Sequence, residues 1–298
     1  MKKTFLILVF GLMVSVGQAQ EWFTSFDVAK RLALVQDKML LVVWEGSFEY
    51  SIPVSYTAVN GNRTVIDLAV DKTLDPIIFN YFVPVRLQEV NHLDVMKKAE
   101  GRGLSYKSKL EDDSIKIMDV NGNILNVDQS SEMILDFSEL INRYALNTSF
   151  LNAELRNYLD NPNYLSSFLL GEKYIEYAMY AQKDLRLEII DLGTIYLEES
   201  KKMAEANSID NLDGVLQKIE LKEIESLLIL NKEGKAKRFL KRIEQQDVET
   251  INQRTYNFLN YVISTLDNDN TNADMWKNEI SSLDLRKAEM ILNIIKHG

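Results

Sequence analysis

The sequence predicts an N-terminal half of the α+β or α/β class, followed by an all-α C-terminal half built from helical hairpins. Branched apolar runs, which are typical of buried strands, occur only before about residue 150, and helical periodicity with short connections dominates after it. A third observation, a basic and then apolar N-terminus, predicts a leader that is removed from the folded chain. We therefore expect three segments, 1–19, 20–150 and 151–298.

The N-terminus has the three-part layout of a secretory signal peptide. Lys2 and Lys3 precede an apolar run over residues 5–16, and small or polar residues follow it up to Ala19 and Gln20, where we expect cleavage. A membrane-bound N-terminal helix is the less favoured alternative, because the run is too short for a stable anchor. No cysteine follows the run, so there is no lipobox. We expect a periplasmic or secreted protein with no stable membrane span after signal cleavage.

The composition limits the chemistry that the chain can perform. Its 298 residues carry a formal charge of −10, and such an acidic chain repels phosphate backbones, so we expect no nucleic acid partner. The chain has no cysteine, which excludes disulfides, thiolate catalysis and cysteine metal sites. Two histidines are too few for a histidine-rich metal site. We therefore expect no metal and no cofactor, and any catalysis must use carboxylates, hydroxyls or lysines.

The N-terminal half begins with a helix and a buried strand. Apolar residues at helical spacing predict a helix over 26–36, and the continuous branched run at 39–44 predicts a strand buried on both faces. A proline in the first turn favours a short helix over 77–81, and a strand follows at 82–87. Residues 65–70 fit either a second short strand or a turn of helix.

A hairpin and a helix are predicted to complete this half. An Asn-Gly pair at 121–122 lies between β-rich runs at 114–118 and 124–127, which is a strong hairpin signal. Ser130 or Ser131 then offers an N-cap for an amphipathic helix that continues into the 140s. The expected result is a small sheet flanked by helices.

The C-terminal half is predicted to contain consecutive helices with short connections, which favours antiparallel hairpins. The predicted helices cover residues 163–181, 184–206, 211–231, 235–246, 249–266, 273–282 and 284–296. The stretch around Gly234 predicts a helix, a glycine turn and a second helix. This pattern resembles tetratricopeptide-type repeats, so we expect a repeat-like helical region.

The predicted order of helix, buried strand, loop, helix, strand, hairpin and final helix resembles the thioredoxin fold over roughly residues 22–148. In that family the buried strand ends in an aromatic-rich loop that carries a C-x-x-C motif. The resemblance places Trp44 at the late aromatic position of the strand and Ser47 where a tryptophan often stands. Phe48 and Ser51 then stand in place of the two cysteines.

The same resemblance implies a domain without redox activity. Thiol–disulfide exchange needs a thiolate nucleophile and a sulfur leaving group, which a serine cannot replace. The family's cis-proline is also absent, because Asp113 and Ser114 stand there, and residues 52–59 make a poor helix. We therefore expect a thioredoxin-like member that has no cysteines and is redox-inactive.

The resemblance also implies a candidate binding loop, since thioredoxin-like domains contact extended chains beside this motif. Its residues are Trp44, Ser47, Phe48, Tyr50 and Ser51. The two exposed aromatic rings would supply contact area and the serines hydrogen bonds. The alternative is that Trp44 and Phe48 belong to the core and that the loop binds nothing.

Five tyrosines form an aromatic stripe over the first two C-terminal helices. They are Tyr164, Tyr174, Tyr177, Tyr180 and Tyr196. A ligand groove is possible there, but a stripe at helical spacing is more often interhelix packing.

The favoured function is an exported, non-catalytic protein that binds a protein or peptide, because stacked helical hairpins build extended concave surfaces. One alternative is a carboxylate- or serine-based hydrolytic enzyme with its site between the domains, which would need converging acids or a serine and a base. The other is a structural subunit of an envelope assembly.

Overall fold

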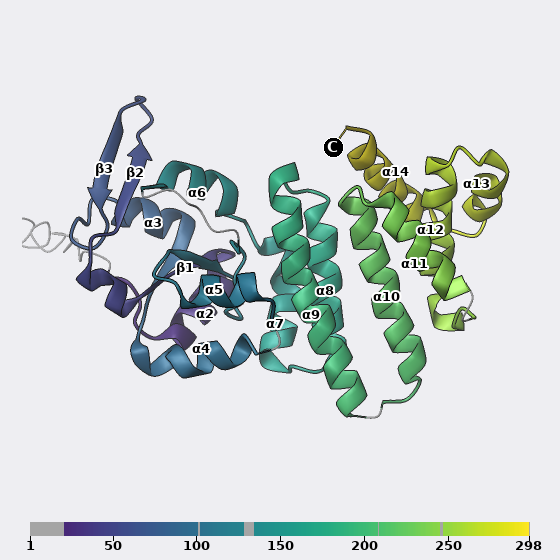
Figure 1. The fold of residues 1–298 in the computed structure, drawn as a ribbon, viewed down its shortest axis with the longest axis horizontal. Helices are drawn as coiled ribbons and strands as arrows, with labels where there is room; N and C mark the ends of the chain where they lie inside the picture. The colour runs from purple at the N-terminus through teal and green to yellow at the C-terminus, as the bar shows by residue number, and fades with distance from the viewer. Residues whose placement is uncertain (1–20, 101, 128–133, 208, 245–246, 298) are drawn as a thin grey trace, which may run out of the picture.

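The structure, a computed structural model, describes residues 21–100, 102–127, 134–207, 209–244 and 247–297. It is a mixed α+β protein in which two small three-stranded sheets lie in the N-terminal part, and helices make up the C-terminal part (Figure 1). The predicted signal peptide, its cleavage site at Ala19 and Gln20, and the predicted caps Ser130 and Ser131 lie outside the described residues.

Among the described residues, the strands and three of the five 3-10 segments precede residue 152, and the other two 3-10 segments lie between C-terminal helices. The strands are β1 (Met39–Trp44), β2 (Pro53–Thr57), β3 (Arg63–Asp67), β4 (Phe82–Leu87), β5 (Lys116–Met118) and β6 (Leu135–Asp136). The 3-10 segments are η1 (Glu45–Glu49), η2 (Glu89–Asn91), η3 (Ser149–Leu151), η4 (Lys183–Leu185) and η5 (Thr250–Asn252).

The helices fall into a shorter N-terminal set and a longer C-terminal set. The first set is α2 (Phe26–Gln36), α3 (Asp75–Tyr81), α4 (His92–Lys98), α5 (Leu104–Glu111) and α6 (Phe137–Tyr144). The second set is α7 (Asn152–Asp160), α8 (Tyr164–Ala178), α9 (Arg186–Ala206), α10 (Leu212–Ile229), α11 (Glu233–Glu244), α12 (Gln253–Leu266), α13 (Asn270–Lys277) and α14 (Ser282–His297).

The first sheet is centred on β1, as its branched apolar sequence predicts. β1 pairs in parallel with β4 and antiparallel with β5, and all six of its residues are buried. An isolated parallel bridge joins Phe23 to Val85 beyond β4, and an antiparallel bridge joins Met118 to Ile124 beyond β5. The Asn-Gly prediction is thereby confirmed as a tight turn, in which Gly122 has φ 84° and its amide donates to the Asp119 carbonyl at 3.0 Å.

The second sheet follows the predicted loop directly and places β2 between β3 and β6. β2 and β3 form an antiparallel hairpin, and β2 pairs in parallel with the two residues of β6. This sheet resolves the ambiguity at residues 65–70, since 63–67 form a strand. The segment 53–57, rich in branched residues and led by a proline, is a strand because distant β6 completes its pairing.

Helix α6 begins later than the sequence predicts. Asp136 is its N-cap, and the Asp136 side chain accepts from the backbone amides of Ser138 at 3.0 Å and Glu139 at 3.1 Å. An aspartate that follows a strand directly makes an effective cap, since its carboxylate satisfies two amides of the first turn. The predicted cap at Ser130 or Ser131 is therefore wrong for this helix.

In the C-terminal part, the predicted succession of helices is confirmed from α8 to α14. Helix α7 was not predicted, α13 spans Asn270–Lys277 instead of 273–282, and the α10–α11 connection differs from the prediction. The turn is made by Asn231, which has φ 57°, and Gly234 lies inside α11. Asparagine tolerates the left-handed region because its short side chain can bond locally, so no glycine is needed there. The predicted glycine turn at Gly234 is wrong.

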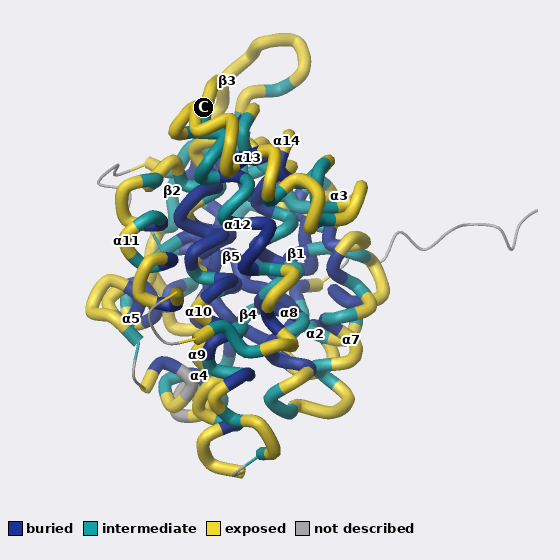
Figure 2. The backbone as a smooth tube through the Cα atoms, turned by 90° about the vertical axis from the view of Figure 1, so that its right-hand side faces the viewer, coloured by how far each residue is buried: buried dark blue, intermediate teal, exposed yellow. Residues whose placement is uncertain are grey.

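The buried apolar side chains of the two parts form one continuous cluster, which extends from Trp22 to Ile294. Figure 2 shows this buried interior running through the middle of the molecule, with the exposed residues in the outer loops and helix faces. Around residue 150 the secondary structure therefore changes, but the apolar packing continues from one part into the other.

Candidate functional site

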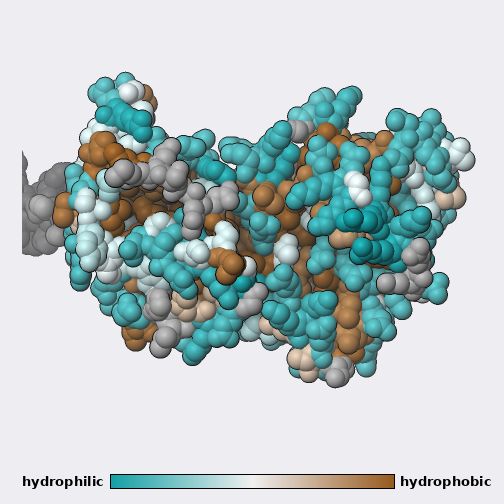
Figure 3. Space-filling view, viewed as in Figure 1, coloured by the Kyte–Doolittle hydropathy of each residue, from teal (hydrophilic) through white to brown (hydrophobic). Residues whose placement is uncertain are grey.

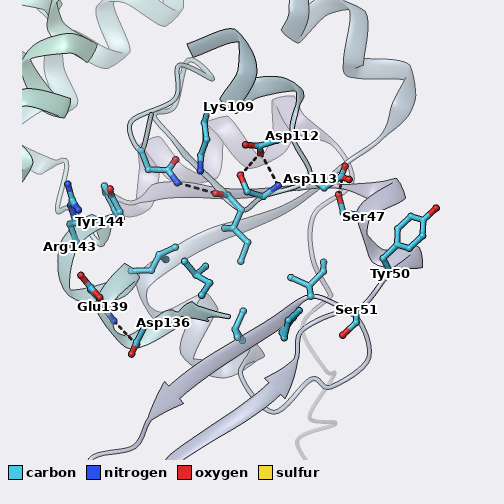
Figure 4. A pocket seen from close by; sticks show the side chains of 18 residues that line it. Ser47, Tyr50, Ser51, Lys109, Asp112, Asp113, Asp136, Glu139, Arg143 and Tyr144 are labelled. Atoms are coloured by element: carbon cyan, nitrogen blue, oxygen red, sulfur yellow. Dashed lines mark hydrogen bonds between the residues drawn. The ribbon is translucent and has the colours of Figure 1, made fainter. Parts of the chain in front are cut away.

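A groove of about 890 Å³ lies in the N-terminal part, beside the segment that follows β1. Asn126 and three stretches line it: residues 47–54, residues 109–115 and residues 135–144, the last comprising β6 and α6. Figure 4 shows these three stretches facing one another around a shared space. They come from distant parts of the sequence, so only the folded sheet brings them together.

The middle of the groove is apolar. Its lining there consists of Ile52, Pro53, Val54, Ile115, Leu135 and Leu140. Figure 3 shows apolar surface in this region of the N-terminal part, between the β2–β3 hairpin and α6. A concave, apolar surface with polar groups at its ends is typical of a ligand site.

One end of the groove is formed by the loop that precedes β5. Ser47 is only 4% exposed, and its hydroxyl donates to the Asp113 carboxylate at 3.4 Å. Beneath this loop, the ammonium of the fully buried Lys116 donates to the backbone carbonyls of Asp112 at 2.6 Å and Ser114 at 3.0 Å. These bonds hold the 112–114 backbone in place against the sheet.

Burial also changes the acidity of this lysine. Desolvation lowers the pKa of Lys116 to about 8, and the attraction of Asp112 offsets only part of that effect. The ammonium lies 5.8 Å from the centre of the Trp44 ring. Lys116 is therefore a titratable group directly behind the wall of the groove.

The other end of the groove is formed by the start and the inner face of α6. Asp136 caps the helix and lies 3.3 Å from the Arg63 guanidinium of β3. Arg143 pairs with Glu188 of α9 at 2.8 Å. Glu139 is exposed at the groove rim (Figure 4). This end therefore presents carboxylates, while its arginine is already paired with the C-terminal part.

The predicted loop residues divide into two sets. Ser47, Tyr50 and Ser51 line the groove, and Tyr50 is 72% exposed with its hydroxyl directed away from the apolar middle (Figure 4). Trp44 and Phe48 do not line it. Trp44 and Phe48 thus have the core-packing role that the sequence analysis gave as the alternative to binding.

Trp44 and Phe48 are held by core contacts. The indole of the buried Trp44 donates to the Leu110 carbonyl at 3.1 Å. Phe48 packs edge-on against Trp22 with ring centres 5.4 Å apart, and the Arg86 guanidinium lies 4.1 Å from the Phe48 ring centre. Aromatic rings placed in this way stabilise the sheet edge rather than offering free contact area.

The residues that the sequence analysis missed are those of the two other walls, Asp112 to Ile115 and Leu135 to Tyr144. No local signal marks them, because their role depends on which strands pair. The antiparallel placement of β5 beside β1 brings the first wall next to Ser47, and the parallel pairing of β6 with β2 brings the second.

The polar lining of the groove consists mainly of hydroxyls and carboxylates. Ser47 is buried, its hydroxyl donates to the Asp113 carboxylate at 3.4 Å, and no histidine lies among the described groove residues. An activated serine needs an adjacent base within hydrogen-bond reach. Across the described residues, no group of three or more histidines, aspartates or glutamates is placed to hold a metal ion.

Two tyrosines of the aromatic stripe pack against the turn that follows β5. Tyr174 and Tyr196 are fully buried and stacked, with ring centres 5.6 Å apart. The Tyr174 hydroxyl donates to the Asp119 carboxylate at 3.3 Å, and Tyr196 bonds the same oxygen. Burial, reinforced by Asp119, raises the pKa of both tyrosines well above the ordinary value. These two residues are interface packing, while Tyr180 is exposed.

Comparison with known proteins assigns no family: no protein-family model matches the chain, and neither a curated protein nor a solved structure is significantly similar to it. In the part of the chain that the structure describes, no helix has the length and hydropathy that a bilayer span requires. The groove is therefore the feature of the molecule that bears most directly on function.

Proposed function

We propose that this chain is an exported protein that binds a polypeptide segment, without chemical turnover, in the groove beside β1. The observation that carries the proposal is the composition of the groove, which is apolar in the middle and polar at both ends. An extended peptide has apolar side chains and a polar backbone. Its apolar side chains would be buried in the middle of the groove, and its backbone groups would form hydrogen bonds at the ends.

We also propose that residues 22–148 form a thioredoxin-like domain without redox activity. Support comes from the buried central strand β1, its parallel neighbour β4 and its antiparallel neighbour β5, which follow the predicted order. The β2–β3 hairpin departs from that order, because the resemblance implies a helix after the 44–51 segment. The hairpin supplies part of the groove wall instead.

The non-catalytic part of the proposal depends on which nucleophiles the chain contains. Without cysteine, thiol–disulfide exchange has no nucleophile and no leaving group. The groove hydroxyls of Ser47 and Ser114 donate to the carboxylates of Asp113 and Asp112, and no histidine lies among the described groove residues. Binding is therefore the activity that these side chains support best.

Fluorescence anisotropy with a pool of labelled, unstructured ten-residue peptides tests the binding. Apolar residues in the centre of each peptide and polar residues at its ends match the groove. We expect affinities in the micromolar range, and about tenfold weaker binding by Ser51→Arg, which places a long charged side chain at the rim. Ser149→Arg is the matched control, since Ser149 is exposed in η3, outside the groove lining.

Two results would overturn this proposal. One is the absence of saturable binding for every peptide at concentrations of about 100 μM. The other is hydrolysis of the peptides by the wild-type chain and its loss in Ser47→Ala, which would favour the serine-based enzyme. Intact-mass measurement of the exported protein tests the location, with a chain that begins at Gln20 as the expected result.

A further inference from the structure

The β2–β3 hairpin ends the second sheet with a strand that has only one neighbour. β3 pairs with β2 and lies at the edge of the sheet order β3-β2-β6. The hairpin extends beyond the rest of the N-terminal part (Figure 1, upper left), and its tip is exposed (Figure 2). An unpaired edge strand offers backbone donors and acceptors to another strand.

The hydrogen bonds of the hairpin identify the backbone groups that face outward. The amide of Leu68 donates to Ile52 at 2.9 Å, and that of Ala58 donates to Asn62 at 2.9 Å. In an antiparallel ladder with this register, the even-numbered residues of β3 bond to β2. The odd-numbered residues Arg63, Val65 and Asp67 therefore direct their amides and carbonyls away from the sheet.

These three residues are self-complementary. If a second copy of β3 runs antiparallel about a two-fold axis at Val65, each Val65 faces the other, and Arg63 of each copy faces Asp67 of its partner. The outward backbone groups then meet: the two Val65 residues bond each other, and each Asp67 amide donates to an Arg63 carbonyl. The Asp67 carbonyl already accepts from the Asp71 amide at 2.8 Å, so its bond with the Arg63 amide of the other copy would contribute less to the pairing.

The side chains fit the same pairing. Val65 is 58% exposed and shares one face of the strand with Arg63 and Asp67. Opposite charges placed across two strands are favourable, and two valines make an apolar cross-strand pair. The Arg63 guanidinium donates to the Ser55 hydroxyl at 2.8 Å and lies 3.3 Å from Asp136, and the side chain is still 60% exposed, so it is accessible to a partner. One oxygen of the Asp67 carboxylate accepts from the amides of Ile52 and Ala69. The edge carries no lysine or proline that would block another strand.

We propose that two copies of this chain associate through their β3 strands, in antiparallel register centred on Val65, to form one continuous sheet. The contact is short, and an interface of this size forms weak, concentration-dependent dimers. The surface lies outside the groove, so the dimer leaves the proposed peptide site open.

The absence of cysteine makes a direct test possible without background thiols. In the proposed register, Val65→Cys places two cysteines on a directly opposed pair with Cα atoms about 5.5 Å apart, which is within disulfide range. We expect at least about tenfold more disulfide-linked dimer in a glutathione buffer than for two control variants. Thr64→Cys is one control, because Thr64 would face Ile66. Val35→Cys is the other, because Val35 is exposed on α2.

Sedimentation equilibrium of the mature chain measures the association itself. We expect the dimer fraction to rise between roughly 10 and 500 μM. Val65→Lys should abolish this rise, because two ammonium groups would meet on the axis, while Val35→Lys should leave it unchanged. Hydrogen exchange adds a local readout, with the amides of Val65 and Asp67 slowed only at high concentration.

Three results would overturn the proposal. The first is a chain that stays monomeric over the whole concentration range. The second is equal cross-linking of all three cysteine variants. The third is a dimer that persists in Val65→Lys or that leaves the Val65 amide unprotected. Capture of an extended peptide on β3 by a chain that stays monomeric would assign the edge to a different partner.

Discussion

The Asp119 carboxylate accepts a hydrogen bond from the Tyr196 hydroxyl, 77 residues further along the chain, where the β5 hairpin turn meets α9. Both residues are fully buried. The side-chain amides of Asn121 and Asn123 also donate to this hydroxyl, at 2.9 and 3.0 Å. One phenol oxygen therefore joins the turn of the N-terminal sheet to the C-terminal helices.

Tyr196→Phe should lower the free energy of unfolding by about 2–4 kcal/mol, because it leaves a buried carboxylate and two buried amides without this partner. Urea unfolding followed by circular dichroism measures the change. Tyr180→Phe is the matched control, since Tyr180 is 64% exposed, and it should change stability by less than about 0.5 kcal/mol. Equal effects of the two substitutions would show that the buried network contributes nothing.

Two glycine-to-alanine substitutions should change the free energy of unfolding in opposite directions. A Cβ at Gly171 would lie 2.8 Å from the Gly193 carbonyl oxygen and 2.9 Å from Leu197, at the close contact of α8 with α9. Gly171→Ala should therefore destabilise the chain by about 1–3 kcal/mol. A Cβ at Gly234 would meet no atom within 4 Å, and Gly234→Ala in α11 should stabilise it by about 0.5–1 kcal/mol.

Thermal and urea unfolding of the two alanine variants check these signs. A destabilised Gly234→Ala would indicate that residue 234 needs the freedom of a turn, in agreement with the sequence expectation and against the helix. An unchanged Gly171→Ala would indicate that α8 and α9 can separate without cost.

A buried ion cluster in the helical part should make stability depend on acid pH. Glu225 lies 3.1 Å from the Lys222 ammonium and 2.5 Å from that of Lys287. Burial alone would raise the pKa of Glu225, but the two lysines outweigh it and lower the pKa to about 2. Because the folded pKa is below the ordinary value, the stabilisation is present above about pH 4.5 and is lost as the pH falls toward 2.

Glu225→Gln should reduce the free energy of unfolding at pH 7 by about 3 kcal/mol, since it removes the buried carboxylate that pairs with both lysines and leaves them only Glu172 and Glu176. The difference in free energy of unfolding between this variant and the wild type should be about 1 kcal/mol smaller at pH 3.5, where the wild type has lost part of the stabilisation from ionised Glu225. Urea unfolding at both pH values tests this. Glu220→Gln, on the exposed face of α10, should show no such change, and a pH-independent difference for Glu225→Gln would contradict the argument.

Lys116 should produce a second rise of stability with pH, in the alkaline range. Its folded pKa of about 8 lies below the unfolded value of 10.5, so the unfolded chain binds more protons between these values. Stability from this group therefore rises with pH in that window. Relative to Lys116→Met, the wild type should gain about 1–2 kcal/mol between pH 7 and pH 9.5.

The comparison requires urea unfolding of both proteins at the two pH values. The other titrating groups are common to the two chains and cancel in the difference. Lys72→Met, at an exposed lysine, serves as the control and should show no change with pH relative to wild type. A constant difference for Lys116→Met would mean that Lys116 does not titrate in this range.

Several elements could be predicted because their signals are local. The helix over 26–36 and the strand over 39–44 have the predicted bounds, since helical periodicity and a branched apolar run are contained within each segment. Helix α5 was missed because residues 104–111 are mostly polar and lack a clear apolar stripe. The turn beside Gly234 was misplaced because glycine and asparagine both permit left-handed backbone, and composition does not say which residue adopts it.

The groove could be predicted only in part. Ser47, Tyr50 and Ser51 follow a strand that the sequence identifies, so their place at its end was predictable. Trp44 and Phe48 belong to the same loop, yet contacts with Leu110, Trp22 and Arg86 turn them into the core. Those contacts join residues far apart in sequence, and no local pattern contains them.

The sequence by itself determined the mixed sheet-and-helix class, the absence of thiol chemistry and the central buried strand, because composition and short-range periodicity are properties of each segment alone. Only the tertiary structure decided that 53–67 is a hairpin with an open edge, that the tyrosine stripe bonds Asp119, and that three distant stretches enclose a groove. The physical reason is that strand pairing and buried hydrogen bonds are made between segments, so their free energy depends on which partners the fold brings together.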